Sequence, residues 1–205
     1  MKTIVIQSVL PTHRKTLAAT LITSLIALST VIAHAAPTPL LLDDCSDPKR
    51  NKNGAERLLI DDKGVGSSSH ATQKCEKGVL TVQGDLVPGR GVPAFISEVS
   101  LLSTNGQPGD LSGYSGVRLR VKVLKGILSV QVGSSDITNF DYHTSAPVTG
   151  KRGEFQEVRV PFKDMKRAWS EQTALNLKSI TSVNLVSFGM ARDTFAYEVS
   201  EIGFY

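Results

Sequence analysis

The stretch DLSGYSGVRLRVKV, residues 110–123, alternates apolar and charged side chains with a period of two over its second half. Such alternation is typical of a β-strand that buries one face and exposes the other. The apolar positions are Val117, Leu119, Val121 and Val123, and the positions between them are Arg118, Arg120 and Lys122. The stretch therefore predicts a half-buried strand with a row of three cations on its exposed face.

Seven runs of this kind lie along the chain, and turn-forming residues separate them. They cover residues 79–86, 94–102, 116–124, 127–133, 155–162, 180–188 and 195–205. A parallel sheet would need crossover helices of about a dozen residues between its strands. Only residues 163–177 have the length and composition for one or two helical turns. The pattern therefore predicts an all-β fold, an antiparallel β-sandwich in a single domain.

Three local features refine this prediction. The two-residue link Lys125–Gly126 has the length of a hairpin turn, so we expect residues 116–124 and 127–133 to pair with each other. In the last run the alternation breaks after Val199, which predicts a β-bulge near Ser200 and Glu201. Residues 61–73 are almost all turn formers and small polar residues, and we expect a long loop or an irregular edge strand there.

The N-terminal segment is typical of a secretory signal peptide. A basic start precedes the apolar run of residues 17–33, and Ala33-His34-Ala35 is a small-x-small cleavage signal. Two alternatives are a membrane anchor, for which this run is close to the lower length limit, and a mitochondrial presequence, which should be amphipathic with several arginines. We expect residues 1–35 to be removed, which leaves residues 36–205 as a periplasmic or secreted chain with no stable membrane span.

Removal of this leader changes the charge balance. The leader holds three of the 23 Lys and Arg residues and none of the 19 Asp and Glu residues, so the mature chain has 20 cations against 19 acids and a net charge of +1. A nucleic-acid partner would need a basic surface. The composition of the mature chain therefore argues against nucleic acid as a partner.

Both cysteines, Cys45 and Cys75, lie in the mature chain. An exported protein with two cysteines is most simply explained by one disulfide, because its compartment is oxidising. A redox or metal pair would have a closer spacing, such as two intervening residues. We expect a Cys45–Cys75 disulfide and no metal site formed by these thiols.

Few residues of the mature chain are suited to catalysis. His70 and His143 are its only histidines, and no Gly-x-Ser-x-Gly nucleophile motif is present. The pairs Asp43–Asp44 and Asp61–Asp62 are adjacent in sequence, whereas a glycosidase needs two carboxylates that face each other across a sugar. A calcium site at Asp43 or Asp44 would need further oxygen ligands that the sequence pattern does not supply. We therefore expect no catalytic residue, no metal and no cofactor.

Two features are candidates for ligand binding. The row Arg118, Arg120 and Lys122 has the spacing to meet repeated anionic groups, but the cations can equally pair across the sheet with Glu157 or another acid. The loop of residues 139–153 gathers Phe140, Asp141, Tyr142 and His143, and loops on a rigid sandwich commonly carry binding groups. Its aromatic residues, and the sole tryptophan Trp169, can contact a ligand or cap the core.

Five segments taken together resemble the family named for complex I intermediate-associated protein 30. They are DDKGVGSSS (61–69), GVLTVQGDL (78–86), DLSGYSGVRLRVK (110–122), FQEVRVPFKDM (155–165) and FAYEVSEIGFY (195–205), in the order that the family has them. The chain departs from the family pattern at Val65, where a second glycine is usual, and at Phe155, where tryptophan is common. The resemblance implies a galactose-binding-like jelly-roll sandwich without established catalytic residues. Members assist the assembly of mitochondrial complex I, and related jelly rolls bind carbohydrate, some of them with a structural calcium.

These observations lead to the hypothesis of an exported, noncatalytic jelly-roll domain that binds a glycan or an envelope protein, in an assembly-factor or chaperone-like role. The candidate contact residues are Tyr142, His143, Trp169, Arg118, Arg120 and Lys122. The alternative hypothesis is a small envelope hydrolase or lyase that uses His143 together with Tyr142 or Asp141.

Overall fold

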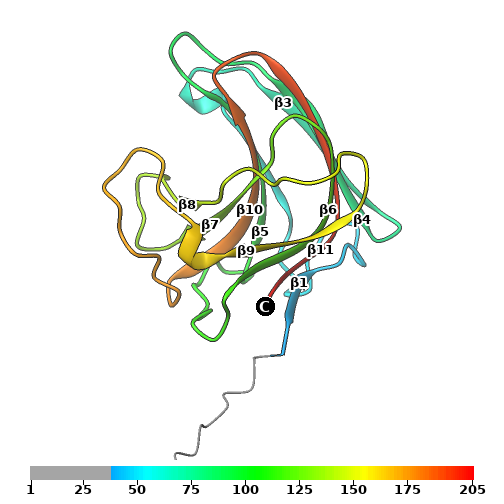
Figure 1. Ribbon diagram of the computed structural model, residues 1–205, viewed down its shortest axis with the longest axis vertical. Coiled ribbons are helices and arrows are strands. Elements are labelled where there is room, and N and C mark those ends of the chain that lie inside the picture. Colours follow the sequence, from blue (N-terminus) through cyan, green and yellow to red (C-terminus); the bar gives the residue numbers. More distant parts are fainter. Residues whose placement is uncertain (1–37) are drawn as a thin grey trace, which may run out of the picture. The chain divides into compact units, whose positions relative to one another are not determined.

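Antiparallel strands dominate the architecture. The computed structural model describes residues 38–205, which form eleven strands and two single-turn 3₁₀ helices. Two antiparallel sheets face each other (Figure 1), which confirms the predicted all-β sandwich, of jelly-roll type. The predicted signal peptide, residues 1–35, lies outside the described residues.

The larger sheet has six strands in the order β3-β4-β11-β6-β9, and β1 also pairs with β11. Its strands are β1 (Leu40–Asp43), β3 (His70–Glu76), β4 (Val79–Leu86), β6 (Gly116–Lys125), β9 (Gln156–Pro161) and β11 (Asp193–Phe204). The smaller sheet has five strands in the order β2-β5-β10-β7-β8. They are β2 (Leu58–Asp61), β5 (Ala94–Leu101), β7 (Ser129–Ser134), β8 (His143–Thr144) and β10 (Ile180–Gly189). The helices are η1 (Lys63–Val65) and η2 (Phe162–Asp164).

The alternating stretch around residue 120 forms β6, beside the central strand β11. Val117, Leu119 and Val121 are fully buried between the two sheets, and the cations that alternate with them point away from the core. The register of the β6–β11 pair shifts between Val199 and Glu201, which confirms the predicted bulge. All seven predicted strands are present, with ends that differ by a few residues.

The predicted pairing across Lys125–Gly126 is wrong. β6 belongs to the larger sheet and β7 to the smaller one, so this link carries the chain from one sheet to the other. A two-residue hairpin of type I′ needs positive φ at both turn residues. Lys77 and Gly78 meet that condition, with φ of 53° and 76°, and they join β3 to β4. In the other link only Gly126 has a positive φ, of 71°.

The N-terminal part of the described chain is fastened to the larger sheet at two points. The Cys45–Cys75 disulfide, with 5.8 Å between its Cα atoms, ties the segment after β1 to β3 and confirms the predicted bridge. Next to it, Arg57 forms a buried ion pair with Asp43, with 2.6 Å between Nε and Oδ2. Asp43, one of the two acids considered as a calcium ligand from the sequence, is therefore engaged by Arg57.

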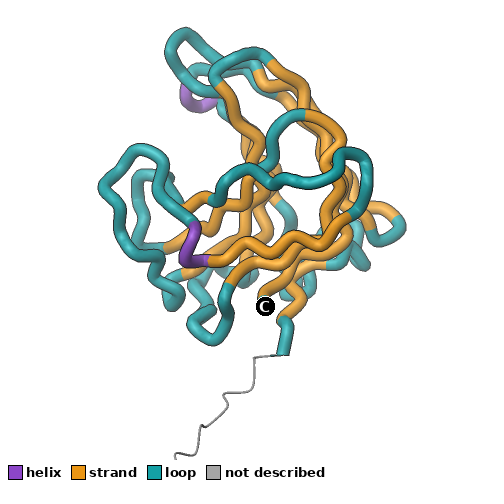
Figure 2. The backbone as a smooth tube through the Cα atoms, in the orientation of Figure 1, coloured by secondary structure: helices purple, strands orange, loops and turns teal. Residues whose placement is uncertain are grey.

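Two long loops lie at one side of the sandwich, around the short strand β8. Figure 2 shows them as loop segments that project beside β7 and β10. The first, residues 135–142, leads into β8, and the second, residues 165–179, connects η2 to β10. The expected one or two helical turns in residues 163–177 are reduced to η2. These loops carry the aromatic residues that the sequence singled out.

Candidate functional site

The row of cations on β6 is already engaged by acids. Arg118 approaches Glu201 to 3.2 Å and Glu157 to 3.7 Å, and Lys122 pairs with Glu198 on β11. Arg120 and Lys122 also lie over the ring of Phe155, at 5.8 and 4.9 Å from its centroid. Cross-strand pairing, one of the two explanations open from the sequence, is therefore what the structure shows for Arg118 and Lys122.

The outward face of the smaller sheet has a different chemistry. Residues directly opposite each other in an antiparallel pair share a face, so the registers of β2, β5, β7, β8 and β10 identify its members. They are Leu58, Ile60, Phe95, Ser97, Val99, Leu101, Ser129, Gln131, Thr144, Ser182, Asn184, Val186 and Phe188. Every one of these side chains is uncharged. We call this set the β10 face.

A row of hydrogen bonds crosses the β10 face from β10 to β8. The Asn184 side-chain amide donates to Gln131 Oε1 at 3.2 Å, and the Gln131 amide donates to Thr144 Oγ1 at 3.1 Å. The Thr144 hydroxyl in turn donates to the carbonyl of Tyr142 at 3.0 Å. Each donor points towards β8, which leaves Asn184 Oδ1 as the acceptor at the other end of the row. This atom is buried and has no hydrogen-bond partner in the described chain.

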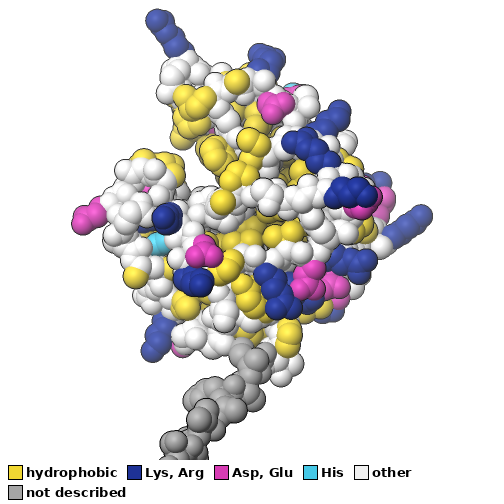
Figure 3. All heavy atoms as spheres, in the orientation of Figure 1, with side chains coloured by type: hydrophobic (Ala, Val, Ile, Leu, Met, Phe, Trp, Pro, Cys, Tyr) yellow, Lys and Arg dark blue, Asp and Glu magenta, His cyan; other side chains and the backbone are white. Residues whose placement is uncertain are grey.

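Asn184 points away from the core, yet it is only 4% exposed. Its neighbours on the same face, Val99 and Val186, are also buried, whereas Phe188 is 46% exposed. Figure 3 shows a hollow in this side of the molecule, between the loops at the top and those at the left, with hydrophobic side chains on both rims. In the same orientation, Figure 1 places the upper half of β10 along the inner edge of this hollow.

The loop residues predicted from the sequence divide between two faces. Tyr142 precedes β8 on the same side as Thr144 and is half-buried, and burial raises the pKa of its hydroxyl. His143 pairs with Val132 on the inward side of the smaller sheet and is 2% exposed. Its Nε2 lies 2.7 Å from the carbonyl oxygen of Thr173. A substrate has no access to His143 in this arrangement.

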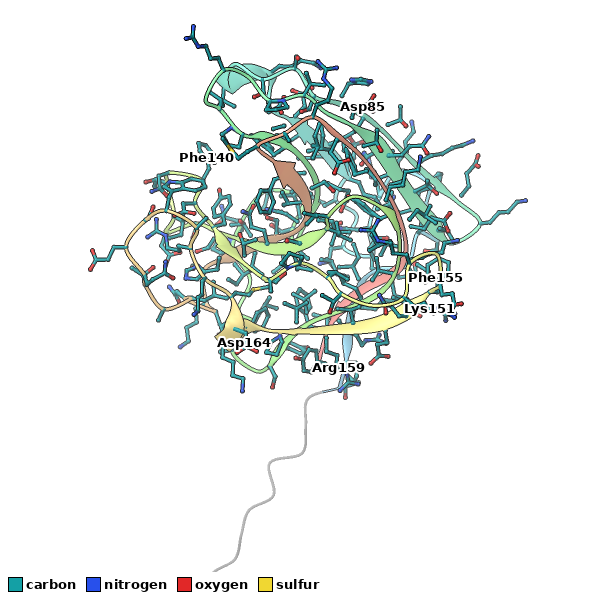
Figure 4. All side chains as sticks on the ribbon, turned by 45° about the horizontal axis from the view of Figure 1, so that its top comes forward. Asp85, Phe140, Lys151, Phe155, Arg159 and Asp164 are labelled. Atoms are coloured by element: carbon teal, nitrogen blue, oxygen red, sulfur yellow. A yellow bond between two sulfur atoms is a disulfide. The ribbon has the colours of Figure 1, made fainter. Side chains whose placement is uncertain are left out.

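Trp169 lies in the second loop and is 72% exposed. Phe140, in the first loop, is 73% exposed, so it does not cap the core. Its ring meets that of Tyr142 edge-on, with 6.3 Å between the centroids. In Figure 4, Phe140 lies on the side of the molecule away from Phe155, which packs beneath the cations of β6.

The remaining acidic candidates serve structural roles. The buried carboxylate of Asp62 accepts hydrogen bonds from the backbone N–H groups of Ser69 and Phe95, both at 2.9 Å, and so fixes the glycine- and serine-rich loop. Within residues 38–205, no group of three His, Cys, Asp or Glu side chains is placed to hold a metal ion. In that same range, no helix has the length and apolar character to cross a membrane.

Sequence reasoning missed the polar residues of the β10 face. In the run ITSVNLVSF, Ser182 and Asn184 occupy the alternate positions that a solvated strand face would also show. The strands on either side of β10 are β5 and β7, which are far from it in sequence, so the run itself does not show which residues surround Ser182 and Asn184. The signal for this site is the amide of Asn184 on a central strand. It can be recognised only when the order of the strands is known.

Comparison with known proteins identifies the family of the chain and solved structures that share its fold. The sequence model of the family described as "Complex I intermediate-associated protein 30 (CIA30)" matches residues 49–199. The family 11 carbohydrate-binding module of the cellulosomal cellulase Lic26A-Cel5E of Clostridium thermocellum has a TM-score of 0.61 at 15% identity, over 83% of this chain and 95% of that one. The structure of the family 11 module from Clostridium thermocellum in complex with a β-1,3-1,4-mixed-linked tetrasaccharide has a TM-score of 0.60 at 14% identity, over 83% of this chain and 96% of that one.

The agarase AgWH50C has a TM-score of 0.52 at 10% identity, over 82% of this chain and 24% of that one. At these identities the likenesses show a shared fold. A search of curated protein sequences finds no match.

Proposed function

Because the chain belongs to the complex I intermediate-associated protein 30 family, we propose that it is an exported, noncatalytic binding module that holds a glycan on the β10 face. The observation that carries this proposal is the row Asn184–Gln131–Thr144, which ends in an unpartnered buried acceptor. A buried acceptor without a partner costs about 1–3 kcal/mol. A sugar hydroxyl that donates to Asn184 Oδ1, after neighbouring side chains of the β10 face move aside to admit it, would recover much of this cost.

The remainder of the face suits the same ligand. Sugars combine hydroxyl groups with apolar ring faces, and binding sites for such ligands pair a few polar groups with aromatic or apolar walls. Phe188 on the β10 face and Tyr142, two residues before Thr144, supply aromatic surface near the polar row. The solved family 11 module with its bound tetrasaccharide has the same fold, which makes a neutral β-glucan a reasonable first probe.

Export to an oxidising compartment is part of the proposal. The disulfide is consistent with a periplasmic or secreted protein, and so is the leader sequence. N-terminal sequencing of the protein isolated from its native cells should give Ala36 as the first residue. A protein that retains residues 1–35 would contradict this step while leaving the binding proposal open to its own test.

The binding test compares variants of residues 36–205 on soluble mixed-linked β-1,3-1,4-glucan, a neutral xylan and an anionic polygalacturonate, by calorimetry. We expect saturable binding to a neutral polysaccharide and a loss of about tenfold in affinity for Asn184→Ala, because one hydrogen bond to a buried group is worth about 1.4 kcal/mol. Asn105→Ala, in the exposed turn between β5 and β6, is the matched control and should bind as the unmodified chain does. Absence of binding to every polysaccharide would refute the glycan proposal.

One observation favours a client protein as the second candidate. Leu58 and Ile60 on β2 are 40% and 46% exposed, and β2 lies at the edge of the smaller sheet. An edge strand with exposed apolar side chains can pair with an extended segment of another protein. For this candidate we expect an envelope protein to co-purify with the chain and to be lost in the Ile60→Lys variant.

A further inference from the structure

A single carboxylate joins the two long loops beside the β10 face. Asp141 is 1% exposed, and its carboxylate accepts hydrogen bonds from three successive backbone N–H groups of the second loop. The donors are Ala168 at 2.8 Å, Trp169 at 3.1 Å and Ser170 at 2.7 Å. Burial acts to raise the pKa of Asp141, but these hydrogen bonds outweigh it and hold the pKa below its usual value. Charge-assisted hydrogen bonds of this kind are the strong ones in proteins.

A second set of contacts reinforces the connection. Arg167 donates to the backbone carbonyl of Asp141 at 3.1 Å and to Asn139 Oδ1 at 3.0 Å. The Asn139 amide then donates to Ser170 Oγ at 2.9 Å. The two loops are therefore crosslinked by side chains from both, although 27 residues separate Asp141 from Ala168.

The residues next to these anchors are large, aromatic and exposed. Phe140 immediately precedes Asp141 and Trp169 is one of its three donors, and their exposed fractions are 73% and 72%. Phe140 also has a φ of 61°, in the left-handed region that a side chain with a Cβ rarely adopts. Such backbone strain persists only where the surroundings enforce it, and it is concentrated at functional sites. The fold thus uses buried polar contacts to hold two aromatic rings in solvent.

We propose that Phe140, Tyr142 and Trp169 form an aromatic platform that stacks on the ring faces of the bound glycan, and that Asp141 is its positioning residue. This inference rests on the proposed function, which supplies the ligand. The polar row of the β10 face ends at the carbonyl of Tyr142, so the platform continues the same site beyond β8. A glycan chain that crosses the strands from β10 to β8 meets hydroxyl-binding groups first and aromatic rings next. Crosslinked loops favour this contact because less conformational entropy is lost on binding.

The single tryptophan of the chain allows a direct test. Titration of residues 36–205 with soluble β-1,3-1,4-glucan should protect Trp169 from acrylamide quenching, because a stacked sugar covers the indole. Trp169→Ala should weaken binding by about five- to tenfold, as expected for loss of one stacking contact and its buried area. Leu124→Ala, which removes an exposed apolar side chain from the outward face of the larger sheet, is the control and should bind as the unmodified chain does.

A test of Asp141 as a positioning residue needs a measurement that does not change when the substitution only lowers the stability of the fold. In Asp141→Asn an amide group faces the N–H donors, so Trp169 should become more mobile and its fluorescence anisotropy should fall. Affinity should fall by about fivefold in an otherwise unmodified chain and hardly at all when Trp169→Ala is already present. A loss of thermal stability with unchanged anisotropy and affinity would refute positioning by Asp141.

The outcomes separate the platform from the function on which it rests. If Asn184→Ala weakens binding and Trp169→Ala does not, the glycan site stands and the platform is refuted. If the unmodified chain binds no polysaccharide, both fail.

Discussion

Replacement of Glu98 by glutamine should remove a fall in stability that the protein undergoes between about pH 4.5 and 8. Glu98 lies on β5 with its side chain between the sheets and is fully buried. Burial first, and then the charge of Asp43, raise its pKa from 4.5 to about 8, against the hydrogen bond from Ser100 and the charge of Arg57. The folded protein therefore holds a proton at Glu98 that the unfolded chain releases.

The sign and size of the effect follow from this difference. The contribution of protonated Glu98 is fully present below the unfolded pKa of 4.5 and is lost as the pH rises through the folded pKa of about 8. Each pKa unit between the unfolded and folded values is worth about 1.4 kcal/mol, so protonated Glu98 contributes on the order of 4–5 kcal/mol to the free energy of unfolding. That is a large part of the stability of an ordinary domain, about 5–15 kcal/mol.

Urea unfolding of residues 36–205, followed by circular dichroism at several pH values with the disulfide intact, measures this contribution. Glu98→Gln should match the unmodified chain near the unfolded pKa and exceed it by several kcal/mol near pH 8. Glu171→Gln, which makes the same substitution at an exposed glutamate, is the matched control. Parallel stability profiles for Glu98→Gln and the unmodified chain would refute the assignment of the raised pKa to this residue.

Three further predictions concern stability, each measured by the same urea unfolding. Reduction of the Cys45–Cys75 disulfide, with a sequence separation of 30, should cost about 3–4 kcal/mol, and a smaller loss for the double Cys→Ser variant would contradict this. Arg57→Ala should cost about 3–5 kcal/mol because it leaves Asp43 charged and buried, whereas Arg159→Ala, at an exposed pair with Glu157, should cost less than about 1 kcal/mol. Gly84→Ala should cost about 1–3 kcal/mol, because the added Cβ would lie 2.7 Å from Ala71 Cα and force β3 away from β4; unchanged stability would show that β3 moves freely.

Seven strands could be predicted because each has one apolar face against the core. The other four lack this signal, and only β3 was partly anticipated, because residues 61–73 were expected to form a long loop or an irregular edge strand and β3 is an edge strand that begins at His70. β2 reads Leu58, Leu59, Ile60 in succession, and only Leu59 packs against the core. The inward positions of β3 are Ala71, Gln73 and Cys75, which have little apolar bulk. Strands without a clearly apolar face are defined by their neighbours, and a single sequence does not contain that information.

The sequence predicted which loop carries the candidate site, but not the contacts that hold that loop in place. The loop after residue 139 stood out because it concentrates aromatic residues, and Tyr142 and Trp169 remain candidate contacts. The partners of Asp141 are 27–29 residues further along the chain, and they are backbone groups without any sequence signature. His143 is adjacent to Tyr142 but faces the core, because neighbouring residues of a strand point to opposite sides.

The two outward faces of the sandwich differ in charge, so ionic strength can distinguish which of them binds. The β10 face carries no ionised side chain, and a glycan held there should have the same affinity from about 0.05 to about 0.5 M NaCl, because neutral contacts are not screened. A ligand on the cation row would have to compete with Glu198 and Glu201 for Lys122 and Arg118, and its affinity should fall steeply over that range. Arg118→Ala should therefore leave binding to neutral polysaccharide unchanged. If affinity instead falls with salt and Arg118→Ala abolishes binding, the binding site lies on the larger sheet and the ligand is anionic, not neutral.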